Sequence, residues 1–196
     1  GQIKENHMNR SVSNTRPVDT MDVELAPLSL RLPDAGSAVE DALARALEFA
    51  ASKTGVHGPA AVLEGLRRRD ASIYQYTSYG LASHLAETLG ALDDTVNGVY
   101  LFDAGVADED EVFGEPAREL ALHLIVWVER KTKALTALIA GLDRALVQAI
   151  ASLQVMPARP HLLDAQIVDS TEVEQRIGYG ALLTSLHQRP LQVWQR

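Results

Sequence analysis

The chain of 196 residues contains no cysteine, and this absence excludes several kinds of chemistry at once. Disulfide bridges, thiolate nucleophiles, iron–sulfur clusters and cysteine-ligated zinc sites all require that side chain. A chain without disulfides fits a reducing compartment, so we predict a cytoplasmic location. No sequence motif points to a particular cofactor, and the cofactor is left unknown.

Long apolar runs and an excess of positive charge are also missing. No uninterrupted apolar run reaches about 18 residues, so we expect no membrane-spanning helix. The N-terminus has no charged start followed by an apolar stretch, and no signal peptide is predicted. The 18 Lys and Arg residues are outnumbered by 26 Asp and Glu residues. Since neutralising phosphates requires clustered cations, we predict that neither nucleic acid nor a membrane is a partner.

What the chain does have is enough apolar material for a core. Hydrophobic residues make up 46% of the sequence, and the length suits one well-packed domain. Residues 1–20 are polar and show no periodicity, so we predict a tail. Residues 1–7 resemble a tag remnant because His7-Met8 looks like a cloning junction. We expect residues 21–196 to form a single globular domain.

Apolar periodicity and capping residues predict five helices and four strands besides the segment 120–129. The helices are 38–53 after an N-cap at Ser37, 59–69, 71–92 after an N-cap at Asp70, 132–153, and 171–186 after a capping box of Thr171 and Glu174. The strands are 23–32 at an edge, 99–102 after an Asn97-Gly98 turn, 162–168, and 190–194.

The segment 120–129 decides the fold class. Its apolar residues alternate, and Ile125, Val126 and Val128 are β-branched, so we favour a strand. The alternative is one helix from about 115 to 153, which would make the protein a mainly α, oligomeric bundle; that helix would be far longer than the mean. We therefore predict an α/β or α+β fold with a small mixed sheet, packed by helices, and an N-terminal helical cluster. Strands 99–102 and 120–129 should pair antiparallel, and 120–129 with 162–168 should form a crossover if they are parallel neighbours.

An acidic loop at 103–117 is the first candidate site. Asp103, Asp108 and Asp110 supply the dense carboxylates that a hard divalent cation requires. The spacing does not match an EF-hand, and a run of like charge is more typical of a solvated loop. A metal site held by these residues stays a weaker hypothesis than solvation.

The predicted strand 120–129 carries a second candidate. His123, Trp127 and Glu129 share one of its faces, and a histidine near a carboxylate can act as a general base. Trp127 could stack on a flat ligand. The structural alternative, which we favour, is a half-buried face that a helix covers.

Three cations at the start of the helix 132–153 form the third candidate. Arg130, Lys131 and Lys133 oppose the helix dipole, which is unfavourable by roughly 0.3–1 kcal/mol each. Together with free backbone N–H groups they would suit an anion. No glycine-rich phosphate loop accompanies them, and surface salt bridges are the interpretation we favour.

These patterns leave two function hypotheses. The first is an oligomeric interaction or small-ligand-binding module, which the excess of apolar helices and the lack of a catalytic motif favour. The alternative is an enzyme that acts on a small anionic substrate or uses a divalent metal held by the acidic loop. Under the first hypothesis the chain forms a homo-oligomer and binds a small anionic ligand.

Overall fold

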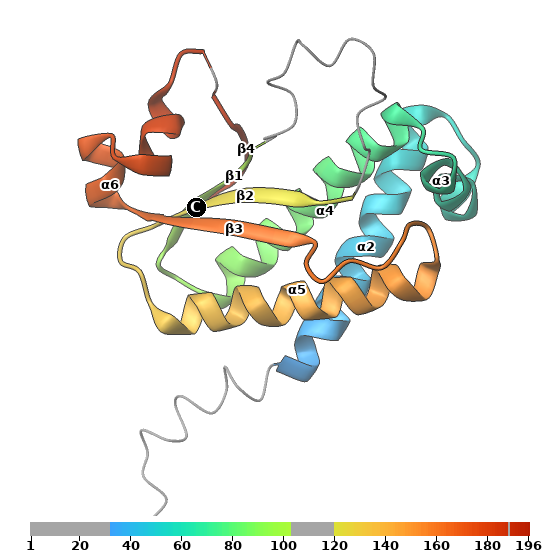
Figure 1. The fold of residues 1–196 in the computed structure, drawn as a ribbon, viewed down its shortest axis with the longest axis horizontal. Coiled ribbons are helices and arrows are strands. Elements are labelled where there is room, and N and C mark those ends of the chain that lie inside the picture. The colour runs from blue at the N-terminus through green and yellow to red at the C-terminus, as the bar shows by residue number, and fades with distance from the viewer. Residues whose placement is uncertain (1–31, 103–119, 188) are drawn as a thin grey trace, which may run out of the picture.

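The computed structural model describes residues 32–102, 120–187 and 189–196 (Figure 1). The elements in chain order are α2 (Leu32–Thr54), α3 (Gly58–Arg67), α4 (Ala71–Leu92), β1 (Val96–Leu101), β2 (Leu122–Val128), α5 (Lys133–Leu153), β3 (Leu163–Asp169), α6 (Ser170–Gln175), the 3-10 helix η1 (Gly178–Thr184) and β4 (Leu191–Gln195). The predicted tail 1–20, the predicted strand 23–32 except Leu32, and the acidic loop lie outside the described residues.

The four strands form one mixed sheet in the order β3-β2-β1-β4. Strand β1 pairs antiparallel with β2 and with β4, while β2 pairs parallel with β3. Helix α5 connects the two parallel strands, as the segment order 120–129, helix, 162–168 predicted. The small mixed sheet with packed helices confirms the predicted α+β class, and the mainly α bundle is excluded.

Helices α4 and α5 cover one side of this sheet, which we call the inner face (Figure 1). Alternate residues of β2 point into it and are fully buried: Leu122, Leu124, Val126 and Val128. Helix α5 packs against this face with a stripe of buried residues at helical spacing: Leu135, Leu138, Leu142, Leu146 and Ile150. Each such side chain contributes roughly 1.5–3 kcal/mol when it leaves water, so this interface forms the main core.

Helix α2 packs against α4 and α5 and begins earlier than predicted. The expected N-cap at Ser37 is wrong, because the helix already starts at Leu32 and continues through Pro33. Proline is compatible with a first helical turn, since its missing N–H would have no partner there. At Gly80 of α4 a Cβ would lie 3.1 Å from the Ala46 Cα, so this glycine permits the close approach of α2.

The start of α5 is the predicted junction between a strand and a helix. Thr132 caps the helix, and its Oγ1 accepts a hydrogen bond from the Leu135 N–H at 3.2 Å. Of the helices in the described ranges, α5 alone is long and apolar enough to cross a membrane by length and composition. Its apolar stripe is buried against the inner face of the sheet, as is usual for a core helix of a globular domain.

Two further predictions are wrong in detail. Asn97-Gly98 forms no turn but lies within β1, beside a bulge in its pairing with β2. The helix expected over 171–186 ends at Gln175, since Arg176 adopts a left-handed conformation (φ 56°) and η1 follows. The capping box is real but formed by Asp169 and Glu172, two residues before the predicted pair.

Candidate functional site

The side of the sheet opposite to α4 and α5, which we call the outer face, carries the predicted site residues His123 and Trp127. The strand register arranges its side chains in rows that cross the sheet. The rows are Phe102, His123 and Asp164; then Gln192, Tyr100, Ile125 and Gln166; then Gly98, Trp127 and Val168. The outer face is thus more polar and aromatic than the inner face.

One half of the outer face, which we call the covered half, lies under α6 and η1. Ile125 and Val168 are buried there together with Leu183 of η1, and Trp127 packs against this small cluster. The helix α6 and η1 lie close together, because a Cβ at Gly180 would overlap the Glu172 carbonyl at 2.5 Å. Gly180 therefore has a packing role.

The covered half is fastened by a chain of hydrogen bonds around Glu129. The Trp127 indole N–H donates to Ser170 Oγ at 3.1 Å, and that hydroxyl donates to Glu129 Oε2 at 3.0 Å. The Asn97 amide donates to the same oxygen at 2.9 Å. This network joins β1, β2 and α6, so Trp127 and Glu129 hold the fold together at this end.

The other half, which we call the open half, consists of Phe102, Tyr100, His123, Asp164 and Gln166. His123 Nδ1 lies 3.3 Å from Asp164 Oδ2, and the two side chains keep 41% and 58% of their surface exposed. The Gln166 amide donates to the other Asp164 oxygen at 3.3 Å. These groups can offer donors and acceptors to a ligand. Phe102 and Tyr100 are partly buried against Ile125, Val168 and Leu183 and expose the rest of their aromatic surface.

His123 and Glu129, which the sequence placed on one face, do not form one site. They stand six residues apart on a strand, which corresponds to about 20 Å at 3.3 Å per residue. The carboxylate beside His123 is Asp164 of β3, its direct partner in the parallel register. A histidine–carboxylate pair is therefore present, but with a partner that the sequence analysis did not name.

Tyr100 borders the open half and its environment is mixed. Burial raises the pKa of its phenol, and the nearby Arg189 guanidinium lowers it by a smaller amount. The Gln192 amide lies 3.4 Å from the Tyr100 hydroxyl and donates to it. The structure therefore brings a cation, Arg189, to the aromatic border of the open half.

Of the three basic residues at the start of α5, Lys131 has an ion-pair partner among the described residues. Lys131 forms an ion pair with Glu172 of α6, as the preferred salt-bridge interpretation predicted. Arg130 and Lys133 are exposed, and neither has an ion pair with another described residue. Thr132 already occupies one of the backbone N–H groups that an anion would use.

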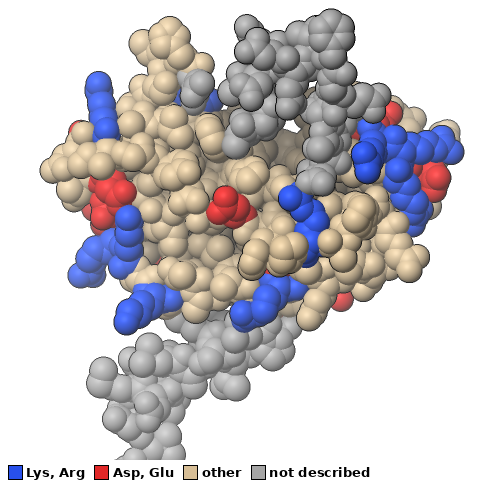
Figure 2. Space-filling model, viewed as in Figure 1, with Lys and Arg blue, Asp and Glu red and all other residues tan. Residues whose placement is uncertain are grey.

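Basic side chains elsewhere lie in separate groups rather than in one stripe (Figure 2). At the α3 end, Arg67 and Arg68 pair with Glu64. Arg67 also donates to the carbonyls of Leu153 and Gln154 at the end of α5. The acidic candidates Asp103, Asp108 and Asp110 lie outside the described residues, and within the described ranges no three His, Asp or Glu side chains gather as a metal site.

Sequence analysis missed a second histidine–carboxylate pair, between α5 and the start of β3. Asp143 is 6% exposed, and one of its oxygens accepts the N–H groups of Leu162 at 2.8 Å and Leu163 at 2.9 Å. Its other oxygen lies 2.7 Å from His161 Nδ1. Burial raises the pKa of this carboxyl, but the hydrogen bonds from His161 and the two amides outweigh it and the net pKa is lowered. The pair fixes the chain where it enters β3.

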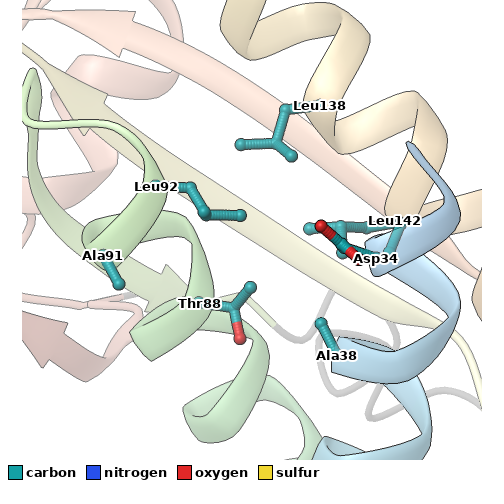
Figure 3. A pocket seen from close by; sticks show the side chains of 8 residues that line it. Asp34, Ala38, Thr88, Ala91, Leu92, Leu138 and Leu142 are labelled. Carbon is teal, nitrogen blue, oxygen red and sulfur yellow. The ribbon is translucent and has the colours of Figure 1, made fainter. Parts of the chain in front are cut away.

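A pocket of about 260 Å³ lies on the helical side of the molecule, between α2, α4 and α5 (Figure 3). Its walls are aliphatic, formed by Ala35, Ala38, Ala91, Leu92, Leu138 and Leu142. Thr88 and Asp34 are its polar lining residues, and Asp34 is the charged one. The pocket is separated from the open half by the sheet itself.

No protein-family model, curated protein or solved structure matches this chain. The functional argument consequently rests on the geometry of the described residues.

Proposed function

We propose that the protein is a binding module that holds a small, planar, anionic molecule on the open half of the outer face. The observation that carries this proposal is the exposed His123–Asp164 pair, which shares a row of the sheet with the partly buried side chain of Phe102. A ligand site of this kind needs flat apolar surface for contact area and a few polar groups for orientation. The open half offers both, whereas the covered half uses its polar groups internally.

The anionic character of the ligand follows from the charges at the border of the open half. Arg189 lies close enough to Tyr100 to influence its ionisation, and a guanidinium pairs well with a carboxylate. The Asp164 carboxylate would repel a second anion placed directly on it, so the anionic group should lie away from the His123–Asp164 pair. The expected pose has the ring over Phe102 and Tyr100 and the anionic group toward Arg189.

A series of aromatic carboxylates, beginning with benzoate, tests the proposal by saturation-transfer NMR. Binding should weaken by about tenfold or more in Arg189→Ala, because loss of a charge-assisted hydrogen bond is worth roughly 1.5–3 kcal/mol. His123→Ala should weaken it as well. Arg144→Ala is the matched control, because Arg144 is an exposed arginine of α5 and not part of the sheet.

Absence of binding by every aromatic carboxylate at millimolar concentration would contradict the proposal. An equal loss in Arg144→Ala would show that the anion is attracted by overall charge instead.

We also propose a cytoplasmic location, which the lack of cysteine supports.

A divalent-metal enzyme is the second candidate, and the His123–Asp164 pair favours it because both side chains are possible metal ligands. Elemental analysis of the purified protein separates the two candidates. A stoichiometric divalent ion that disappears in Asp164→Asn would support the enzyme. A metal-free protein that binds aromatic carboxylates would support the binding module.

A further inference from the structure

We propose that a second copy of the chain docks head to tail, with its Leu186 inserted into the aliphatic pocket between α2, α4 and α5. Leu186 follows η1 and is 92% exposed, more than any other large hydrophobic side chain in the described ranges. Water contact of a complete leucine side chain is unfavourable, but single exposed apolar side chains are common on protein surfaces, so Leu186 indicates an interaction only together with a pocket that fits it. The side chain is therefore available as an anchor.

The pocket fits such an anchor in both size and lining. A volume of about 260 Å³ is below the range of about 300–1,000 Å³ that drug-sized ligands occupy, but it accommodates an aliphatic side chain. Figure 3 shows Leu92, Leu138 and Leu142 around the space, with Asp34 at one side. The lining thus matches a leucine better than it matches a polar small molecule.

Charge complementarity points to this chain's own anchor. His187 follows Leu186 directly and Arg189 lies three residues after it, and both are exposed. Asp34 is the charged residue of the pocket and is exposed as well. A leucine with the cation Arg189 three residues after it faces an aliphatic pocket that has the Asp34 carboxylate at its side, so apolar contact and charge favour the same pairing.

The arrangement in space permits the contact between two copies but not within one. The segment after η1 lies on the outer side of the sheet, whereas the pocket is formed by helices on the inner side (Figure 1). Because anchor and pocket are different surfaces, the contact is heterologous and leaves one anchor and one pocket free. A single anchor implies weak assembly that grows with protein concentration.

Sedimentation velocity over about 10 µM to about 1 mM tests the proposal. The wild type should show a sedimentation coefficient that rises with concentration. Leu186→Asp removes the anchor, and Ala91→Trp places an indole over the pocket from an exposed position of α4. Both variants should stay monomeric. Ile177→Asp, at another exposed apolar residue beside η1, is the control and should behave as the wild type.

A mixture of the two interface variants gives the sharpest result. Leu186→Asp keeps its pocket and Ala91→Trp keeps its anchor, so a 1:1 mixture should form a dimer that does not extend further. Asp34→Lys replaces Ala91→Trp if that variant fails to fold, and should be equally monomeric alone. A monomeric wild type over the whole range, a mixture that stays monomeric, or equal loss of association in Ile177→Asp would each overturn the proposal.

Discussion

The molecule contains two histidine–aspartate pairs, and they differ in almost every physical respect. At the junction of α5 and β3, His161 Nδ1 lies 2.7 Å from Asp143, whose side chain is 8% exposed. On the outer face, His123 Nδ1 lies 3.3 Å from Asp164, whose side chain is 58% exposed. The two aspartates thus differ in burial, whereas His161 keeps 79% of its side chain exposed and His123 keeps 41%.

The difference lies in how many partners each carboxylate already has. Asp143 accepts two backbone N–H groups as well as the histidine, and its capacity is used within the fold. Within the described residues, the Asp164 carboxylate has two side-chain partners, His123 and Gln166, and both are themselves accessible. A group that is fully satisfied and buried stabilises, whereas a group that is partly satisfied and exposed can bind something else.

Replacing each aspartate by alanine should separate the two roles most strongly. Asp143→Ala leaves two buried N–H groups without a partner, which should lower the free energy of unfolding by roughly 2–4 kcal/mol. Asp164→Ala should change it by no more than about 0.5 kcal/mol, as is usual for exposed positions. Urea denaturation measures both, and similar losses in the two variants would remove the distinction.

The pH dependence of stability should sharpen the same contrast. The pKa of Asp143 is lowered in the folded protein, so its contribution is complete above the unfolded pKa of about 3.9. The contribution is lost as the pH falls through the lower, folded-state pKa. Between pH 6 and pH 3 the wild type should therefore lose more stability than Asp143→Asn, measured by thermal unfolding. Parallel curves for the two proteins would rule out this linkage.

Trp127→Phe tests whether the covered half of the outer face is structural. The change keeps an aromatic ring but removes the indole donor to Ser170, and Ser170 still donates to Glu129. One lost hydrogen bond should lower the free energy of unfolding by about 1 kcal/mol, between the two aspartate variants. Binding of an aromatic carboxylate to the open half should be unchanged. A variant of normal stability with impaired binding would place Trp127 in the site instead.

The smallest effect is expected at the basic residues that begin α5. Lys131 and Glu172 form an exposed ion pair, and such pairs are worth at most about 1 kcal/mol. Lys131→Ala should therefore change the unfolding free energy by about 0.5 kcal/mol or less. Phosphate should leave the melting temperature unchanged, since Thr132 caps the helix. A phosphate-dependent increase that is absent in a Lys131→Glu, Lys133→Glu variant would revive the anion site.

Local sequence patterns were sufficient to predict much of the sheet and its crossover. The β-branched residues of 120–129 and the cap at Asp70 act within a few positions, and the structure contains both features. The start of α2 was predicted wrongly because Pro33 lies in the first turn of the helix, so Ser37 is an interior residue and not the N-cap. The length of α6 was predicted wrongly because Arg176 adopts a left-handed conformation, and an arginine in the sequence does not indicate such a turn.

The site residues were only partly predictable, for a different reason. The place of His123 on the outer face follows from alternation along one strand, but its exposure was not predicted, and its partner Asp164 depends on the register between β2 and β3. Asp143 has its partners 18 to 20 residues later in the chain, so its helix position alone resembles a solvated charge. Periodicity and capping rules describe local sequence, so they cannot predict side-chain partners that tertiary packing brings together.

The most direct test follows the histidine ring signals by NMR while benzoate is added. His123 and His161 each pair with an aspartate, so one spectrum contains the site reporter and its control. We predict that the ring carbon and proton signals of His123 shift in a saturable manner and that those of His161 stay in place. Shifts at His161 without shifts at His123, or no saturable shift at either ring, would contradict the assignment of the open half as a binding surface.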